Sequence, residues 1–213
     1  MSNIMKESFF SIPIFYVDIE NSQELNSKLT HDILQWKKED EKGEHRSNNY
    51  GWHSQDEMHL RDEFANIKNF INYQLKSISL MEEYSLETDL VVQNMWANVS
   101  PKYAYNSYHY HPNCLWSGVY YVQCPSDCGR ILFENKQWHT WSPIYEKELS
   151  QQPHQWDSVH YEAIEGRAIF FPSCIGHEVE QNLTDVEGQD GYRISISFNS
   201  LQIKKGWRPL LNV

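Results

Sequence analysis

The spacing of apolar side chains divides the chain into two parts of different character. In the first part, an apolar run at residues 9–17 predicts a strand, and residues 22–38 carry Leu25, Leu29, Ile33 and Trp36 near helical spacing. A second amphipathic helix is predicted by Phe64, Ile67, Phe70, Ile71 and Leu75. The polar stretch EKGEHRSNNYGWHSQDEMHL between them predicts a loop.

From Leu90 onward the pattern is that of strands. Short segments rich in β-branched and aromatic residues recur between Gly, Pro, Asn and Asp: LVVQNMWANV, SGVYYVQ, RILFEN, RAIFFP, HEVEQN and YRISISFNS. Such a series is typical of a sandwich or barrel. We therefore expect one mainly β domain over residues 1–213, with an N-terminal strand and helices in 1–88 and the β core in 89–213.

A long segment rich in Trp and Gln interrupts these strands at about residues 134–160. Loops of this length in compact domains are often lids or binding loops. Its tryptophans, Trp138, Trp141 and Trp156, would cover the mouth of a pocket or pack beneath the loop.

Composition narrows the classes of function. The formal net charge is -11, which argues against general binding of nucleic acid or of anionic membranes. No apolar run approaches the roughly 20 residues that span a bilayer, and the first residues lack a cleavage pattern, so we expect a cytoplasmic protein. The CPSDC spacing of Cys124 and Cys128 would allow zinc binding or closure of a small loop, but no second pair lies nearby, which favours reduced thiols.

His109 and His111 are separated by one residue, just before a strand with a buried composition. On a strand they would project to the same side, roughly 6–7 Å apart along the chain. His177, after a later strand, could add a third imidazole to a site for Fe, Cu, Ni or Zn. The alternative is that these histidines are structural residues held by hydrogen bonds.

Arg193 and Ser195 form a second pair on one face of a strand. A guanidinium beside a hydroxyl suits a carboxylate, which it would bind through two charge-assisted hydrogen bonds and one further bond. The alternative partner for Arg193 is an Asp or Glu of the protein itself.

Taken in order, the NMWANV strand, His-x-His, SGVYYV, the G-x-A-x-F-F-P strand, His177 and Arg193-x-Ser195 resemble the iron(II)/2-oxoglutarate-dependent oxygenases. The resemblance is to a branch common in marine bacteria and tailed phages, and it extends over nearly the whole chain. It implies a double-stranded β-helix with N-terminal helices packed against it. The implied activity couples decarboxylation of 2-oxoglutarate to succinate with oxidation, by default hydroxylation, of another substrate.

The resemblance also implies roles for single residues. His109 and His177 would bind Fe(II), while Arg193, Ser195 and, as a weaker candidate, Tyr121 would hold 2-oxoglutarate; O2 is the oxidant. Pocket-lining candidates are Asn94, Asn98 and Asn106.

One position departs from the family pattern, because His111 stands where most members carry Asp or Glu. We expect three histidine ligands; the alternative places His111 behind the ligands and completes the site with Glu134 or water. Two rival functions remain at this stage: a cupin-type three-histidine dioxygenase that ignores 2-oxoglutarate, and a non-catalytic binding module on the same barrel. The prime substrate, a small molecule or a protein side chain, and the oligomeric state are unknown from the sequence.

Overall fold

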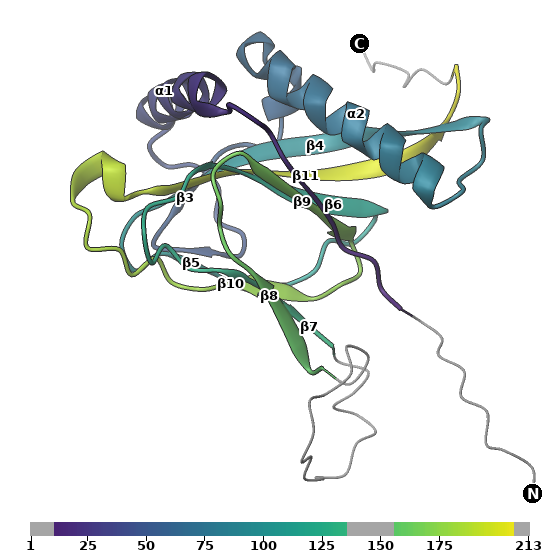
Figure 1. Cartoon of the computed structure of the whole chain (residues 1–213). Coiled ribbons are helices and arrows are strands. Elements are labelled where there is room, and N and C mark those ends of the chain that lie inside the picture. The colour runs from purple at the N-terminus through teal and green to yellow at the C-terminus, as the bar shows by residue number, and fades with distance from the viewer. Residues whose placement is uncertain (1–10, 136–155, 207–213) are drawn as a thin grey trace, which may run out of the picture.

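The computed structural model describes residues 11–135 and 156–206. Two helices, α1 (Gln23–Glu39) and α2 (Ala65–Met81), lie on one side of two stacked β-sheets (Figure 1). The strands are β1 (Phe15–Asp18), β2 (Asn48–Asn49), β3 (Trp52–His53), β4 (Thr88–Ser100), β5 (Tyr105–His109), β6 (Trp116–Gln123), β7 (Ile131–Glu134), β8 (Ser158–Tyr161), β9 (Arg167–Pro172), β10 (His177–Val179) and β11 (Arg193–Lys204). Short 3-10 turns are η1 (Met58–Leu60), η2 (Asp62–Phe64) and η4 (Gly188–Gly191).

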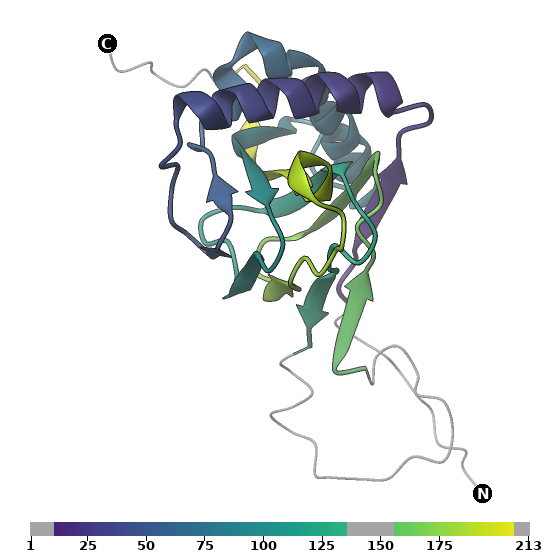
Figure 2. The ribbon, with the colours of Figure 1, turned by 90° about the vertical axis from the view of Figure 1, so that its left-hand side faces the viewer.

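The strands form a six-stranded sheet in the order β1-β9-β6-β11-β4-β3 and a five-stranded sheet in the order β2-β5-β10-β7-β8. All strand pairs within them are antiparallel. Both helices cover the outer face of the six-stranded sheet, and the five-stranded sheet lies against its other face (Figures 1 and 2). This is a double-stranded β-helix with N-terminal helices packed on it, so the predicted fold class is confirmed.

Burial on both faces explains why the central strands are nearly continuous apolar runs. In β6, Tyr120 and Val122 belong to the core beneath the helices, whereas Val119 and Tyr121 belong to the core between the sheets. The Tyr120 hydroxyl also donates a 2.6 Å hydrogen bond to Asn26 Oδ1 on α1, which ties the helix to the sheet.

On β11 the same alternation points a row of polar side chains into the space between the two sheets. Ile194, Ile196 and Phe198 pack in the core under the helices. The intervening residues face the interior between the sheets, and β11 pairs with β4 over its whole length from Arg193↔Ser100 to Lys204↔Thr88. A polar-lined cavity therefore forms inside an otherwise apolar sandwich.

Three regions are compared with the sequence-based expectation. Of the predicted strand at residues 9–17, residues 9 and 10 lie outside the described residues, and within the described part β1 begins at Phe15. The stretch predicted as a loop contains β2 and β3, because the Asn48 side chain bonds the carbonyls of Glu44 and Gly51 and closes the turn between them.

The third region is the long insertion. Residues 136–155, with Trp138 and Trp141, lie outside the described residues, whereas Trp156 is exposed. At the base of the insertion, Glu134 pairs with Ser158 as β7 and β8 come together.

In the part of the chain that the structure describes, no helix is both long and apolar enough to cross a membrane.

Candidate metal centre and anion pocket

Three histidines converge at the inner face of the five-stranded sheet: two lie on its strands, and the third, His111, lies just beyond the end of β5 rather than on a strand as expected. His109 ends β5 and lies directly opposite His177, the first residue of β10, in the antiparallel register. His111 follows two residues after His109, and its backbone N–H bonds the carbonyl of Ser173. One ring nitrogen of each histidine lies within 4.8 Å of the others. The structure thus brings together all three predicted metal ligands.

Hydrogen bonds orient two of these rings for metal binding. His109 Nδ1 lies 2.7 Å from the carbonyl oxygen of Ser107, and His177 Nδ1 lies 3.1 Å from that of Ile175. A backbone carbonyl only accepts, so each Nδ1 carries the proton and each Nε2 presents its lone pair. The Ser47 hydroxyl is 3.5 Å from His109 Nε2.

Burial keeps the three imidazoles neutral. Loss of solvent, together with the charge of His109, lowers the pKa of His111 to about 4. The same causes, desolvation first, lower the pKa of His177 to about 3, and desolvation lowers that of His109. A transition metal binds the neutral form, so this cluster is ready to bind one without releasing protons.

These shifts predict how the stability of the metal-free protein depends on pH. Below the ordinary histidine pKa of 6.5 these histidines are protonated in the unfolded chain but stay neutral in the folded protein. Protons therefore bind preferentially to the unfolded state, and the free energy of unfolding should fall as the pH falls. Each extra proton taken up on unfolding adds about 1.4 kcal/mol per pH unit to the slope. Urea unfolding with a chelator, from about pH 7 to about pH 5, would measure it. A His177→Asn variant should show a shallower slope; equal slopes would contradict the prediction.

No carboxylate joins the cluster within residues 11–135 and 156–206. Glu134, the alternative ligand, is exposed at the end of β7 and lines a separate cavity with Tyr108 and Asp157. Its neighbour Phe133 points to the histidines instead, with its ring centroid 5.9 Å from that of His177. The three-histidine arrangement is therefore the one that the geometry supports.

The histidines line a cavity of about 480 Å³ between the two sheets. Arg193, Ser195 and Tyr121, the residues expected to hold a carboxylate, line the same cavity, and Ser195 and Tyr121 are register partners on β11 and β6. Burial raises the pKa of Tyr121, which therefore remains a neutral hydrogen-bond donor.

Arg193 is a buried charged group in this cavity whose hydrogen-bonding capacity is only partly used. Only 2% of it is exposed, and its Nη1 donates to the carbonyl oxygens of Cys128 and Glu180. Its Nη2 is buried with no hydrogen-bond partner, and no carboxylate of the described residues lies within ion-pair distance. A buried guanidinium with a free edge requires an anion, because leaving the charge unpaired is costly.

The asparagines predicted to line the pocket, Asn94, Asn98 and Asn106, are all found in its wall. The Oδ1 atoms of Asn94 and Asn98 are buried without a partner, whereas Asn106 Nδ2 donates to Ser47 Oγ over 3.1 Å.

Sequence reasoning missed other lining residues, among them Arg46, His53, Asp56 and Trp96. His53 stacks on Trp96 at 5.4 Å between ring centroids, and Trp96 in turn lies 5.8 Å from the ring of His111. Inward-facing alternation on β4 was the signal for Trp96, since it lies between Asn94 and Asn98 at strand spacing.

Comparison with known proteins gives one family match. Residues 94–199 match the sequence model of a family described as "Putative 2OG-Fe(II) oxygenase". The matched segment contains the three clustered histidines, Tyr121, Arg193 and Ser195. No curated protein sequence matches the chain.

Several solved structures share the fold at low sequence identity. A prolyl-4-hydroxylase from Pseudomonas putida is 12% identical with a TM-score of 0.59, over 88% of this chain and 91% of that chain. The epimerase SnoN in complex with Fe3+, alpha ketoglutarate and nogalamycin RO is 11% identical with a TM-score of 0.60, over 90% and 80%. A viral collagen prolyl hydroxylase from Paramecium Bursaria Chlorella virus-1 is 11% identical with a TM-score of 0.54, over 88% and 94%.

Proposed function

We propose that this chain, whose residues 94–199 belong to the 2OG-Fe(II) oxygenases, is a hydroxylase in which His109, His111 and His177 hold the iron. Arg193, Ser195 and Tyr121 would hold 2-oxoglutarate. One observation carries the proposal: a buried guanidinium with a free edge lines the same cavity as three converging neutral imidazoles. A metal site alone would leave that guanidinium unexplained.

Bound Fe(II), 2-oxoglutarate and O2 supply the oxidising chemistry, in which 2-oxoglutarate is decarboxylated to succinate and the prime substrate is oxidised. The protein supplies position and charge. The carbonyls of Ser107 and Ile175 fix two ring orientations, and the Arg193 charge fixes one end of the co-substrate. Apolar side chains of the inner core, including Val119, Ile131 and Phe171, line the cavity and limit the entry of water.

The prime substrate would enter past Arg46, Asp56 and Tyr110, which line the cavity and of which Arg46 and Tyr110 are exposed. Similar structures include prolyl hydroxylases and an epimerase, so the fold admits both protein and small-molecule substrates. We assign a small molecule or a protein side chain as the substrate class, and the cytoplasm, that of a host if the gene belongs to a phage, as the location.

An anaerobic titration of the metal-free protein with Fe(II) and then 2-oxoglutarate tests the proposal without knowledge of the prime substrate. We expect the weak visible charge-transfer band of a 2-oxo acid chelated to iron. Iron binding without this band would favour a metal dioxygenase that does not use 2-oxoglutarate. A protein that takes up no iron would be a binding module on the same barrel.

Substitution of His111 tests whether this residue is itself a ligand. His111→Ala should lower the affinity for Fe(II) by at least about 100-fold, since it removes one of three donors. His111→Asp should retain binding, because the resemblance noted from the sequence implies a carboxylate donor at this position. Isothermal titration with Fe(II) under anaerobic conditions measures both. A loss of less than about 100-fold in His111→Ala would place this residue behind the ligands.

A further inference from the structure

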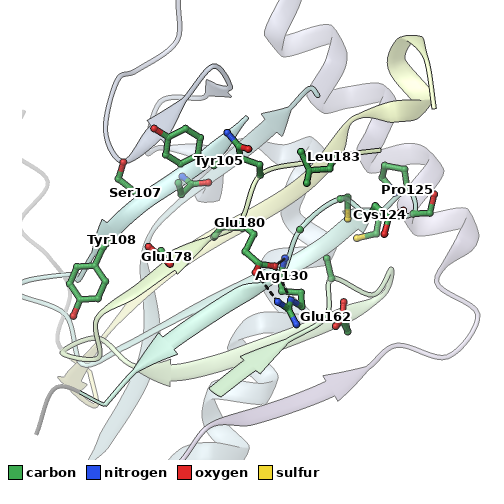
Figure 3. A pocket seen from close by; sticks show the side chains of 18 residues that line it. Tyr105, Ser107, Tyr108, Cys124, Pro125, Arg130, Glu162, Glu178, Glu180 and Leu183 are labelled. Atoms are coloured by element: carbon green, nitrogen blue, oxygen red, sulfur yellow. Dashed lines mark hydrogen bonds and ion pairs between the residues drawn. The ribbon is translucent and has the colours of Figure 1, made fainter. Parts of the chain in front are cut away.

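A loop with two cysteines packs against the Arg193 side chain, and it lines a groove separate from the cavity that holds the histidines. It joins β6 to β7, carries Cys124 and Cys128 in CPSDC, and lines a groove of about 1140 Å³ on the outer face of the five-stranded sheet. Figure 3 looks into this groove, with Cys124 and Pro125 to one side of the Arg130–Glu180 ion pair. The metal cluster lies elsewhere, because none of its histidines lines this groove.

The loop backbone is packed directly on the guanidinium. The Cys128 carbonyl oxygen accepts a hydrogen bond from Arg193 Nη1. The next residue, Gly129, has φ +87°, and a Cβ there would lie 2.8 Å from Nη1 and 2.6 Å from the Glu180 carbonyl oxygen. The Gly129 backbone therefore lies so close to the guanidinium that no side chain fits between them. A shift of the neighbouring peptide would for this reason also move Arg193.

The two thiols are paired in a way that favours oxidation of one by the other. The Cys124 thiol hydrogen-bonds to Cys128 and thereby lowers the pKa of Cys128, and the positive charge of Arg193 lowers it further against the opposing effect of burial. The same hydrogen bond, together with burial, raises the pKa of Cys124. Cys128 is therefore the better thiolate, and Cys124, four residues away in the same loop, lines the same groove.

We propose that Cys124 and Cys128 form a reversible disulfide that weakens the binding of 2-oxoglutarate by displacing the Cys128 carbonyl from Arg193. The inference rests on the proposed role of Arg193 as the anchor of that co-substrate. Hydrogen peroxide is the oxidant: the Cys128 thiolate attacks one of its oxygens, the O–O bond breaks, and sulfenic acid and hydroxide form; the hydroxide takes up the proton that the Cys128 thiol had released and leaves as water. The Cys124 sulfur then attacks the sulfenic sulfur, an S–S bond forms and a second water leaves.

The geometric consequence follows from the length of the bond. The two sulfurs must approach to about 2.05 Å when a disulfide forms, which pulls the Cys124 and Cys128 main chains together. Cys124 N is held by the Glu165 carboxylate over 3.0 Å, and the Asp127 carbonyl oxygen accepts from Leu183 N over 2.8 Å. With both of these fixed, the Cys128 peptide is the part of the loop left to rotate.

The test uses the full chain, freed of metal and treated with hydrogen peroxide that is then removed. Peptide mapping by mass spectrometry should find a Cys124–Cys128 disulfide. Calorimetry with zinc in place of iron should then show about tenfold weaker binding of 2-oxoglutarate, reversed by a thiol reductant. Cys124→Ser should bind 2-oxoglutarate equally well before and after the treatment, whereas the matched control Cys174→Ser, at an exposed thiol outside the loop, should respond like the wild type.

The mapping and the calorimetry each have a result that would contradict the inference. Absence of the disulfide, or a disulfide that leaves the affinity unchanged, would overturn the inference. A reduced wild-type protein that fails to bind 2-oxoglutarate would instead overturn the proposed function and with it the effect on binding, while the mapping would still decide whether the thiols pair.

Discussion

Replacing His177 by alanine is expected to abolish iron binding and all turnover of 2-oxoglutarate. His177 lies at the centre of the cluster, directly opposite His109 in the register of β5 and β10, with its ring centroid 4.3 Å from that of His109 and 5.2 Å from that of His111. Loss of partners that merely orient ligands costs metal affinity about 10- to 100-fold, so loss of a ligand should cost at least about 100-fold. Anaerobic Fe(II) titration with an iron-sensitive dye measures the effect.

The buried position of His177 calls for controls on folding. Its ring packs on Phe171 at 4.7 Å between centroids, so His177→Ala also leaves a cavity, whereas His177→Gln keeps most of the volume and should lose iron as well. His160→Ala removes an exposed histidine of β8 in the same sheet and should bind iron like the wild type. If His177→Ala still binds iron with wild-type affinity while folded, the three histidines are not the metal site.

The fold was predictable where local pattern and tertiary environment agree. SGVYYV and RAIFFP are apolar at most positions because β6 and β9 are buried on both faces, under the helices and against the other sheet. The segment at residues 41–60 carries no such pattern, and β2 and β3 within it are held by partners distant in sequence, such as Val99 opposite Trp52. Strands that depend on a distant partner leave little local signal.

The site was predictable to a similar extent. Arg193 and Ser195 could be recognised because strand alternation places both on one face of β11, and the structure puts them in one cavity with His109 and His111. For the histidines the i, i+2 spacing led to the right pair, although β5 ends at His109 and His111 follows it. His53 could not, because it reaches the cavity only through the pairing of β3 with β4, where it lies opposite Asn98.

The alternative ligand Glu134 shows the limit of the same reasoning. It was named as the carboxylate that could complete the coordination in place of His111, but the parity of β7 sends Phe133 inward and Glu134 outward. Strand parity depends on the register with β10, which the local sequence does not specify.

Replacing Arg193 by alanine is expected to spare iron binding and to weaken 2-oxoglutarate binding at least about thirtyfold. Truncating one partner of a buried hydrogen-bonded charge pair costs about 2–5 kcal/mol, and burial of the co-substrate in this cavity leaves little water to replace the contact. Arg193→Lys should recover only part of the affinity, because an ammonium cannot present two parallel N–H groups to a carboxylate. Calorimetry with 2-oxoglutarate on the metal-loaded protein, beside the Fe(II) titration, separates the two effects.

Arg130→Ala is the matched control for charge. Arg130 is paired with Glu180 on the outer face of the five-stranded sheet, so its loss removes an equal charge near the site without opening the cavity. Because Arg193 also holds the carbonyls of Cys128 and Glu180, the unfolding midpoint of each variant must be compared, and affinity interpreted only for those that remain folded. If Arg130→Ala weakens 2-oxoglutarate binding as much as Arg193→Ala does, Arg193 would contribute only its positive charge and not a specific contact with the co-substrate. Wild-type affinity in a folded Arg193→Ala would leave the unpaired guanidinium without a function in co-substrate binding, and would favour a metal enzyme that works without 2-oxoglutarate.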